Sequence, residues 1–446
     1  MKNKIKIING LAILPEGISS VSIEIEDGFI SNISKKKEYS KVDVVLDARR
    51  KFVLPGFIDI HTNGIAGFDL SNGVYELDSG NFISDKSAYI KGLNNALMAY
   101  AKTGVTRALL TSLASPIEQL KKVFGFVSLY KSNFVNSPWK GIIEGLYVEG
   151  TFMKLNEYRG AHNPKYFNKP SIKLFDELQK ASNGLIKIVN VVPEWEDDAL
   201  ELIKYLFKNN IVCAAGHTGA TGTQYQKAIK SGLTLAIHFL NGPTGSSTKP
   251  FGGGGAVENI LRDSNMFAEI IVDGYHVDKA YVMDTIKRKG FDKVCAITDS
   301  MFTAAFKGIK KIHVLGIDGT VSKNGKYLQI ADREYALFGS MLTMDKAFSN
   351  LLTWLTNPIE GIWNKLHSPL SFDEAIINAS ALCSKNPAKV LGIYEPSFKI
   401  DNAKQNTFTG SIEVGKSADI IIMDIKEINN NYKIKISNVF VKGQLL

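Results

Sequence analysis

The stretch 212–217, VCAAGH, is a short apolar run that ends in a histidine, and the fold prediction depends on this pattern. Further apolar runs end in a metal-binding or acid–base residue, namely His61, Glu149, His238, His276 and Asp299. Buried parallel strands that present such side chains at their carboxyl ends are how a (β/α)8 barrel builds an active site. The repetition therefore predicts a barrel whose functional residues share one face.

The spacing of the apolar runs supports this fold class across the middle of the chain. In the stretch 197–209, Leu200, Ile203 and Phe207 recur at the spacing of one helix face. Helices between parallel strands are what the crossover rule requires. We therefore expect an α/β fold with a (β/α)8 TIM barrel over 53–401 and further helices at 338–357 and 372–391. The strand candidates lie near 53–61, 105–112, 142–150, 186–193, 211–217, 235–241, 268–276 and 294–300.

The two ends of the chain have a different pattern. Residues 1–52 contain short β-like pieces separated by Asn9-Gly10 and Asp27-Gly28, which favours hairpins. Residues 402–446 contain two strand-like runs. We expect these two segments to pair as one small β-sandwich domain. The segments 71–90 and 305–335 are predicted to be insertions over the barrel mouth, and no function is predicted for them.

Composition narrows the class of protein. Of 446 residues, 45% are hydrophobic and 22% charged, which is enough apolar material for a large core. The net charge of +9 favours anionic partners, and because the lysines are spread along the chain we expect a small anionic substrate and no nucleic acid. No apolar run approaches the roughly 18 residues of a membrane span, so no membrane partner is expected.

Cysteine usage and the first residues suggest a location. The three cysteines are far apart and form no CxxC motif, which is typical of buried thiols in a reducing compartment. The apolar stretch near the start ends at Asn9-Gly10, before a signal-peptide core could form. We expect a cytoplasmic enzyme.

The residues that end the strands suggest metal-assisted hydrolysis. A divalent metal used for hydrolysis takes two or three His or carboxylate ligands and leaves a position open for water. Glu149, His217 and His238 supply that set from three different predicted strands. Asp299 ends the eighth strand, where a carboxylate can take a proton from water and return it to a leaving group.

Several motifs together resemble the N-acetylglucosamine-6-phosphate deacetylase family of the amidohydrolase superfamily, from about residue 5 to the C-terminus. The motifs are LPGFIDIH at 54–61, VEG at 148–150, GAHNP at 160–164, AGHTGAT at 215–221, DGYHVD at 273–278, TD at 298–299 and GSMLTM at 339–344.

The resemblance implies a role for each matching residue. Glu149, His217 and His238 would hold one divalent metal ion, with zinc expected and iron, cobalt or manganese left open. Asp299 would activate water to attack the acetamide of N-acetylglucosamine 6-phosphate, and His162 would polarise the carbonyl.

The resemblance also implies a binding site for the rest of this phosphorylated amino sugar. His276 would bind the sugar or its phosphate, and the backbone N–H groups of Asn241 and Gly242 would bind the phosphate. Lys249 stands where the family usually has arginine and would reach the site of a partner subunit, which implies a homodimer.

Two departures from superfamily patterns leave part of the function open. Binuclear members have His-x-His in the first strand, whereas this chain has His61-Thr62-Asn63, so His61 is either a weak second-site metal ligand or a water-holding residue. Thr151 follows Glu149-Gly150 where proline is usual, so specificity could belong to another N-acetyl hexosamine phosphate. The alternatives are an amidohydrolase for a different amide and a non-catalytic barrel paralogue. The joint presence of Glu149, His217, His238 and Asp299 argues against the second.

Overall fold

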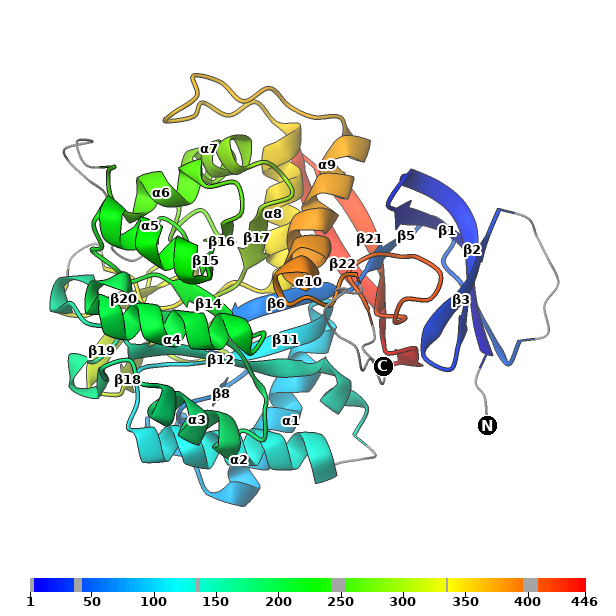
Figure 1. The fold of residues 1–446 in the computed structure, drawn as a ribbon. Coiled ribbons are helices and arrows are strands. Elements are labelled where there is room, and N and C mark those ends of the chain that lie inside the picture. Colours follow the sequence, from blue (N-terminus) through cyan, green and yellow to red (C-terminus); the bar gives the residue numbers. More distant parts are fainter. Residues whose placement is uncertain (1–3, 36–41, 134–136, 242–252, 334–335, 396–407) are drawn as a thin grey trace.

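The computed structural model describes residues 4–35, 42–133, 137–241, 253–333, 336–395 and 408–446 (Figure 1). Its centre is a parallel sheet of eight strands, each paired with the next along the chain. The first and last of them meet, since Thr62 bridges Ser300 and Asp299 N donates to His61 O at 2.9 Å. The predicted barrel and all eight of its strands are confirmed. The strands are β6 (Phe57–Thr62), β11 (Val105–Ser112), β12 (Ile143–Phe152), β13 (Ile186–Val191), β14 (Val212–Ala215), β15 (Leu233–Ala236), β16 (Phe267–Ile271) and β17 (Val294–Ile297).

Helices alternate with these strands and pack around the barrel (Figure 1). In α4, the buried face consists of Ala199, Leu202, Ile203 and Leu206, whereas Phe207 is 55% exposed. The predicted helix is confirmed, and Phe207 lies at the exposed edge of its apolar face. The helices are α1 (Lys86–Lys102), α2 (Ile117–Asn133), α3 (Ile172–Ala181), α4 (Asp197–Lys208), α5 (Gly222–Ser231), α6 (Ala256–Arg262), α7 (Lys279–Lys289), α8 (Met344–Thr356), α9 (Phe372–Ser380) and α10 (Asn386–Val390).

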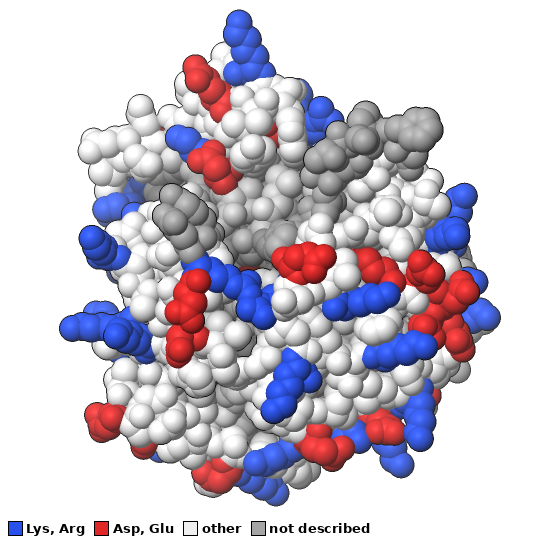
Figure 2. Space-filling model, turned by 90° about the vertical axis from the view of Figure 1, so that its left-hand side faces the viewer, with Lys and Arg blue, Asp and Glu red and all other residues white. Residues whose placement is uncertain are grey.

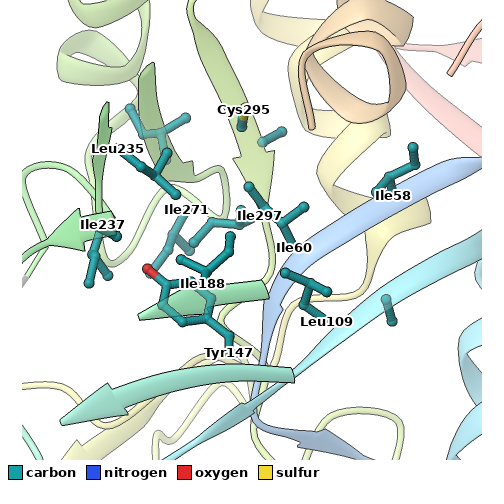
Figure 3. Close-up of a cluster of buried hydrophobic side chains, with 14 of the residues drawn as sticks. Ile58, Ile60, Leu109, Tyr147, Ile188, Leu235, Ile237, Ile271, Cys295 and Ile297 are labelled. Atoms are coloured by element: carbon teal, nitrogen blue, oxygen red, sulfur yellow. The ribbon is translucent and has the colours of Figure 1, made fainter. Parts of the chain in front are cut away.

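Between barrel strands and helices lies one continuous apolar core. Figure 3 shows part of it, in which Ile60 of β6, Leu109 of β11, Ile188 of β13 and Ile297 of β17 approach one another. All four are 0% exposed. Burial of this kind is the main favourable term in folding, and it makes the barrel a rigid support for side chains at its rim. None of the described helices has the length and apolar character needed to cross a bilayer.

Strands from the two ends of the chain share one further sheet, which lies beside the barrel (Figure 1). Its order is β23-β22-β21-β5-β1-β2-β3, and β4 also pairs with β1. A separate apolar cluster that includes Ile7, Ile23, Ile420 and Phe440 fills it. The predicted pairing of the termini is thus confirmed. The strands are β1 (Lys4–Leu14), β2 (Gly17–Glu26), β3 (Phe29–Ser34), β4 (Val44–Asp47), β5 (Phe52–Pro55), β21 (Ile420–Ile428), β22 (Asn431–Val441) and β23 (Gln444–Leu445).

The turns of this sheet agree only in part with the prediction. Asp27 and Gly28 both have positive φ, 51° and 89°, which suits the tight turn of the β2–β3 hairpin. Asn9-Gly10 is not a strand break, because β1 continues through it with a bulge. The pairing is also not all hairpins, since β4 and β5 run parallel to β1.

Two small sheets cover the carboxyl-terminal face of the barrel. One consists of β7 (Gly64–Ile65), β8 (Phe68–Asp69), β9 (Gly73–Tyr75) and β10 (Phe82–Ile83), and the other of β18 (Lys311–Val314), β19 (Ile317–Val321) and β20 (Leu328–Ile330). They share an apolar cluster in which the Tyr75 and Phe302 ring centroids are 4.9 Å apart. The insertions predicted at 71–90 and 305–335 are present, although the first begins earlier and its last residues belong to α1.

Candidate active site

Three of the predicted metal ligands converge at the barrel rim. Glu149 lies in the last part of β12, and His217 and His238 follow β14 and β15. Glu149 Oε1 lies 3.0 Å from His238 Nε2 and 3.4 Å from His217 Nε2. All three residues are buried. Their placement agrees with the prediction from the strand ends.

Backbone carbonyls fix the orientation of both histidines. His217 Nδ1 donates to Tyr158 O and His238 Nδ1 donates to Asn241 O, each at 2.9 Å. When Nδ1 carries the proton, Nε2 is left with a lone pair, which is the form that a metal binds. The donor set, two imidazole nitrogens and one carboxylate, fits a divalent metal of the zinc type.

His61 reaches the same point from β6. Its Nε2 lies 3.4 Å from Glu149 Oε2 and 3.6 Å from Asp299 Oδ1. This nitrogen is buried and has no hydrogen-bond partner among the described residues. His61, Glu149 and His238 form one cluster that could hold a metal ion, and Glu149, His162 and His217 form another. Neither cluster decides between the two roles predicted for His61.

Glu269, which the sequence analysis did not single out, holds His61 in place. Its carboxylate is 0% exposed, and Oε2 accepts hydrogen bonds from His61 Nδ1 at 2.9 Å and from the backbone N of His238 at 3.2 Å. A carboxylate behind a histidine fixes the ring and raises its basicity. The only signal in the sequence was a glutamate inside the apolar run FAEII at 267–271.

Asp299 lies beside the ligands, two residues after the end of β17 at Ile297. Its φ of 47° is unusual for a residue with a side chain, and such conformations cluster at functional sites. Asn63 Nδ2 donates to Asp299 Oδ1 at 2.8 Å. The asparagine that replaces the second histidine of His-x-His thus orients the candidate proton acceptor.

His162 lies in the loop after β12 and faces Glu149. Its Nδ1 accepts a hydrogen bond from Ala114 N at 3.2 Å, so in the neutral ring the proton is on Nε2. That Nε2 lies 3.7 Å from Glu149 Oε2. His162 therefore offers an N–H donor close to the candidate metal centre.

Both ring nitrogens of His276 are already bonded within the protein. Nδ1 lies 2.6 Å from Asp273 Oδ2, and Nε2 lies 2.8 Å from Phe338 O. Burial would lower the pKa of this imidazole, but the Asp273 carboxylate outweighs burial and raises it. The ring therefore presents positive charge to the cavity and no free N–H group.

The charges at the centre depend on one another. Burial alone would raise the pKa of Glu149, but the imidazoles of His61 and His162 outweigh it and hold that pKa well below its usual range. Burial lowers the pKa of His217 to about 4. At neutral pH the site thus presents an ionised carboxylate and a neutral His217, which are the forms that bind metal.

A cavity of about 460 Å³ opens at this centre, and its lining includes Glu149, His162, His217, His238, His276 and Asp299. Asn241 lies in its wall, whereas Gly242 and Lys249 fall outside the described residues. Arg333, another residue that the sequence analysis did not single out, adds a guanidinium whose Nη1 lies 3.4 Å from Gly160 O. Across one face of the molecule, basic and acidic side chains are interspersed (Figure 2).

The barrel and the His–carboxylate cluster at its rim define the class of metal-site barrel hydrolases. The Amidohydrolase family model matches residues 52–446, and the chain belongs to that family. This confirms the superfamily that the motifs indicated.

Similar proteins cover nearly the whole chain. The N-acetylglucosamine-6-phosphate deacetylase of Bacillus subtilis (strain 168) is 27% identical over 94% of this chain and 92% of its own length. The N-acetylgalactosamine-6-phosphate deacetylase of Escherichia coli O157:H7 is 26% identical over 90% and 89%. The crystal structure of the Pasteurella multocida N-acetylglucosamine-6-phosphate deacetylase has a TM-score of 0.78 at 21% identity, with 99% of each chain covered. A mutant of the Mycobacterium smegmatis enzyme in complex with N-acetyl-D-glucosamine-6-phosphate has a TM-score of 0.76 at 21% identity, over 100% of this chain and 99% of that chain.

Proposed function

We propose that this protein hydrolyses the acetamide of N-acetylglucosamine 6-phosphate to acetate and glucosamine 6-phosphate, in amino-sugar catabolism. The convergence of Glu149, His217 and His238 on one point, with Asp299 and His162 around it, is the observation that carries the proposal. Relatives with this activity along nearly the full chain support it.

One divalent metal ion, with zinc expected, would be held by Glu149, His217 and His238. Such an ion lowers the pKa of a bound water and polarises a carbonyl. His61 is proposed as either a weak ligand of a second metal or a residue that holds water, and counting the metal distinguishes the two.

The protein's own groups move the proton. Asp299 accepts a proton from the attacking water and passes it to the departing sugar nitrogen, so that one water is consumed and acetate and an amine leave. His162 donates its Nε2–H to the carbonyl oxygen as negative charge develops there. Asn63 keeps the Asp299 carboxylate in one orientation through its 2.8 Å hydrogen bond.

The phosphate end of the substrate would meet the positively charged wall. We propose that the backbone N–H groups of Asn241 and Gly242, together with Lys249, bind the phosphate. The N–H of Asn241 already donates to His238 O at 2.8 Å, so the phosphate would have to share this hydrogen or displace that carbonyl. His276 would contribute its positive charge against the sugar or phosphate from the position that Asp273 and Phe338 fix. Arg333 lines the same cavity and joins this set.

Replacing Arg333 tests whether this side of the cavity binds the phosphate of the substrate. Arg333→Ala should raise KM for the phosphorylated substrate by about 10- to 100-fold, because it removes a hydrogen bond to a charged group. The KM for the unphosphorylated sugar and the value of kcat should change little. Arg333→Lys, which keeps the charge, is the matched control and should recover part of the loss. Equal losses on both sugars would remove Arg333 from the phosphate site.

Substrate choice is tested by acetate release. The 6-phosphates of N-acetylglucosamine, N-acetylgalactosamine and N-acetylmannosamine are compared with the unphosphorylated sugars, and the glucosamine isomer should have the highest kcat/KM. A galactosamine preference is the second candidate, since relatives of both kinds match. Indifference to the phosphate would contradict the assignment of Lys249 and Asn241.

Removing the metal should destabilise the fold, because binding to the folded state alone adds stability. We expect dialysis against a chelator to lower Tm and zinc to restore it, measured by thermal unfolding. His217→Ala should bind less zinc and show little restoration, whereas the exposed His313→Ala should behave as the parent protein. If the Tm of the chelator-treated protein did not respond to zinc, the proposed metal site would be contradicted.

We further propose a homodimer in the cytoplasm, with 53–401 as the hydrolase barrel and 1–52 and 402–446 as a small β-sandwich domain. The separate apolar cluster of the terminal sheet supports that division. Analytical ultracentrifugation at several protein concentrations tests the dimer, which should appear as twice the mass of 49.0 kDa.

A further inference from the structure

A second cavity, of about 570 Å³, lies beside the candidate active site. Its walls come from the segment after β16, the segment after β17, the tip of the β19–β20 hairpin and the first turns of α8. Tyr275 lines both cavities. The volume is within the range of pockets that bind small molecules.

Three lysines, Lys307, Lys326 and Lys346, line this second cavity. Their ammonium groups have no ion pair and no hydrogen bond to any described residue, and the Nζ of Lys326 lies 6.0 Å from the centre of the Tyr275 ring. Asp273 is the acidic residue among the described lining residues. Three lysines against this one carboxylate leave the cavity with an excess of positive charge, and Asp273 is held by His276 Nδ1 and two backbone N–H groups.

Thr303 supplies a second, independent observation. This residue is 0% exposed and lines the cavity, and its hydroxyl has no hydrogen-bond partner within the described part of the chain. A buried hydroxyl without a partner is costly, so such groups usually meet a ligand or water. Other polar groups of the wall are in use, since Asn350 Nδ2 donates to Val272 O at 2.8 Å and Ser349 Oγ donates to Tyr432 O.

The position in the fold suits an anion. In (β/α)8 barrels, phosphate groups are frequently bound by the loops after the seventh and eighth strands together with a helix N-terminus. Here β16 and β17 are those strands, and Lys346 lies in the first turn of the 13-residue helix α8. Asp345 beside it accepts a hydrogen bond from Thr343 Oγ1 at 2.6 Å and is not part of the lining.

We propose that this cavity is a second binding site, separate from the substrate site, for a small phosphorylated molecule. Its phosphate meets Lys307, Lys326 and Lys346 and accepts a hydrogen bond from the Thr303 hydroxyl. Its body lies against the rings of Tyr275 and Phe306. The first site carries out hydrolysis, and this second site binds without chemistry.

Titration calorimetry with inorganic phosphate and with glucosamine 6-phosphate tests the site in the zinc-loaded full-length protein. The triple variant Lys307→Gln, Lys326→Gln, Lys346→Gln should lose one binding equivalent per chain that the parent has, while acetate release in low-phosphate buffer is retained. The matched control carries the same charge change at Lys310, Lys311 and Lys323, which are exposed in the same insertion and do not line the cavity. It should bind as the parent does.

Thr303→Val gives a subtler test, because it keeps the shape and removes the hydroxyl. It should weaken phosphate binding at this site by about tenfold. A triple variant that binds phosphate as the control does would overturn the proposal. If the parent released no acetate from any sugar while the triple variant still lost one phosphate equivalent, the proposed function would be contradicted and the second site would be supported.

Discussion

Asp299→Asn should lower the rate of acetate release by about 10²- to 10⁴-fold, the usual contribution of a general acid–base group. The asparagine keeps the size of the side chain, and its oxygen can still accept the bond that Asn63 Nδ2 donates at 2.8 Å. It cannot accept a proton from water. We therefore expect kcat to fall while zinc content and Tm remain those of the parent.

The exposed Asp318→Asn is the control for this variant, and it should be fully active. Measurements of kcat, of zinc by atomic absorption and of Tm on the same preparations separate lost chemistry from lost structure. An Asp299→Asn protein as active as the parent would remove Asp299 from the mechanism. If the parent itself hydrolysed no acetamide, the non-catalytic barrel paralogue would become the better interpretation.

The barrel and the residues at its rim were predictable because both follow from local patterns. An apolar run of a few residues marks a buried strand, and a polar residue at its end marks the rim. Glu149, His217, His238 and Asp299 all lie where this rule puts them. The insertions were visible too, as polar segments between the regular units.

The contacts that orient these residues were not predictable, because each joins positions far apart in the sequence. Glu269 and His61 are separated by 208 residues, and Asn63 and Asp299 by 236. A glutamate inside an apolar run becomes informative only when its partner is known. At Asn9-Gly10 a local pattern led to a wrong prediction. This pair is typical of a turn, but β1 pairs with β2 on one side and β4 on the other and continues through it.

Arg107→Met should reduce the free energy of unfolding by about 3–5 kcal/mol, the cost of breaking a buried ion pair. Arg107 of β11 is 2% exposed, and its Nε and Nη2 donate to Asp419 Oδ2 at 2.9 and 2.8 Å. Its Nη1 donates to Glu144 Oε2 at 2.9 Å. Because Asp419 directly precedes β21, the arginine joins the barrel to the terminal sheet. Without it, a fully buried Asp419 carboxylate loses its charged partner.

Urea unfolding followed by circular dichroism measures the change. The control is Arg49→Met, whose guanidinium is 71% exposed beside Asp47 and should cost less than about 1 kcal/mol. The double variant Arg107→Met, Asp419→Asn should recover part of the lost stability, since it no longer buries the unpaired charge of Asp419. If Arg107→Met cost no more than Arg49→Met, the ion pair would not hold the terminal sheet on the barrel. The contacts between β22 and α8, among them the hydrogen bond from Tyr432 N to Thr353 Oγ1 at 3.0 Å, would have to do so.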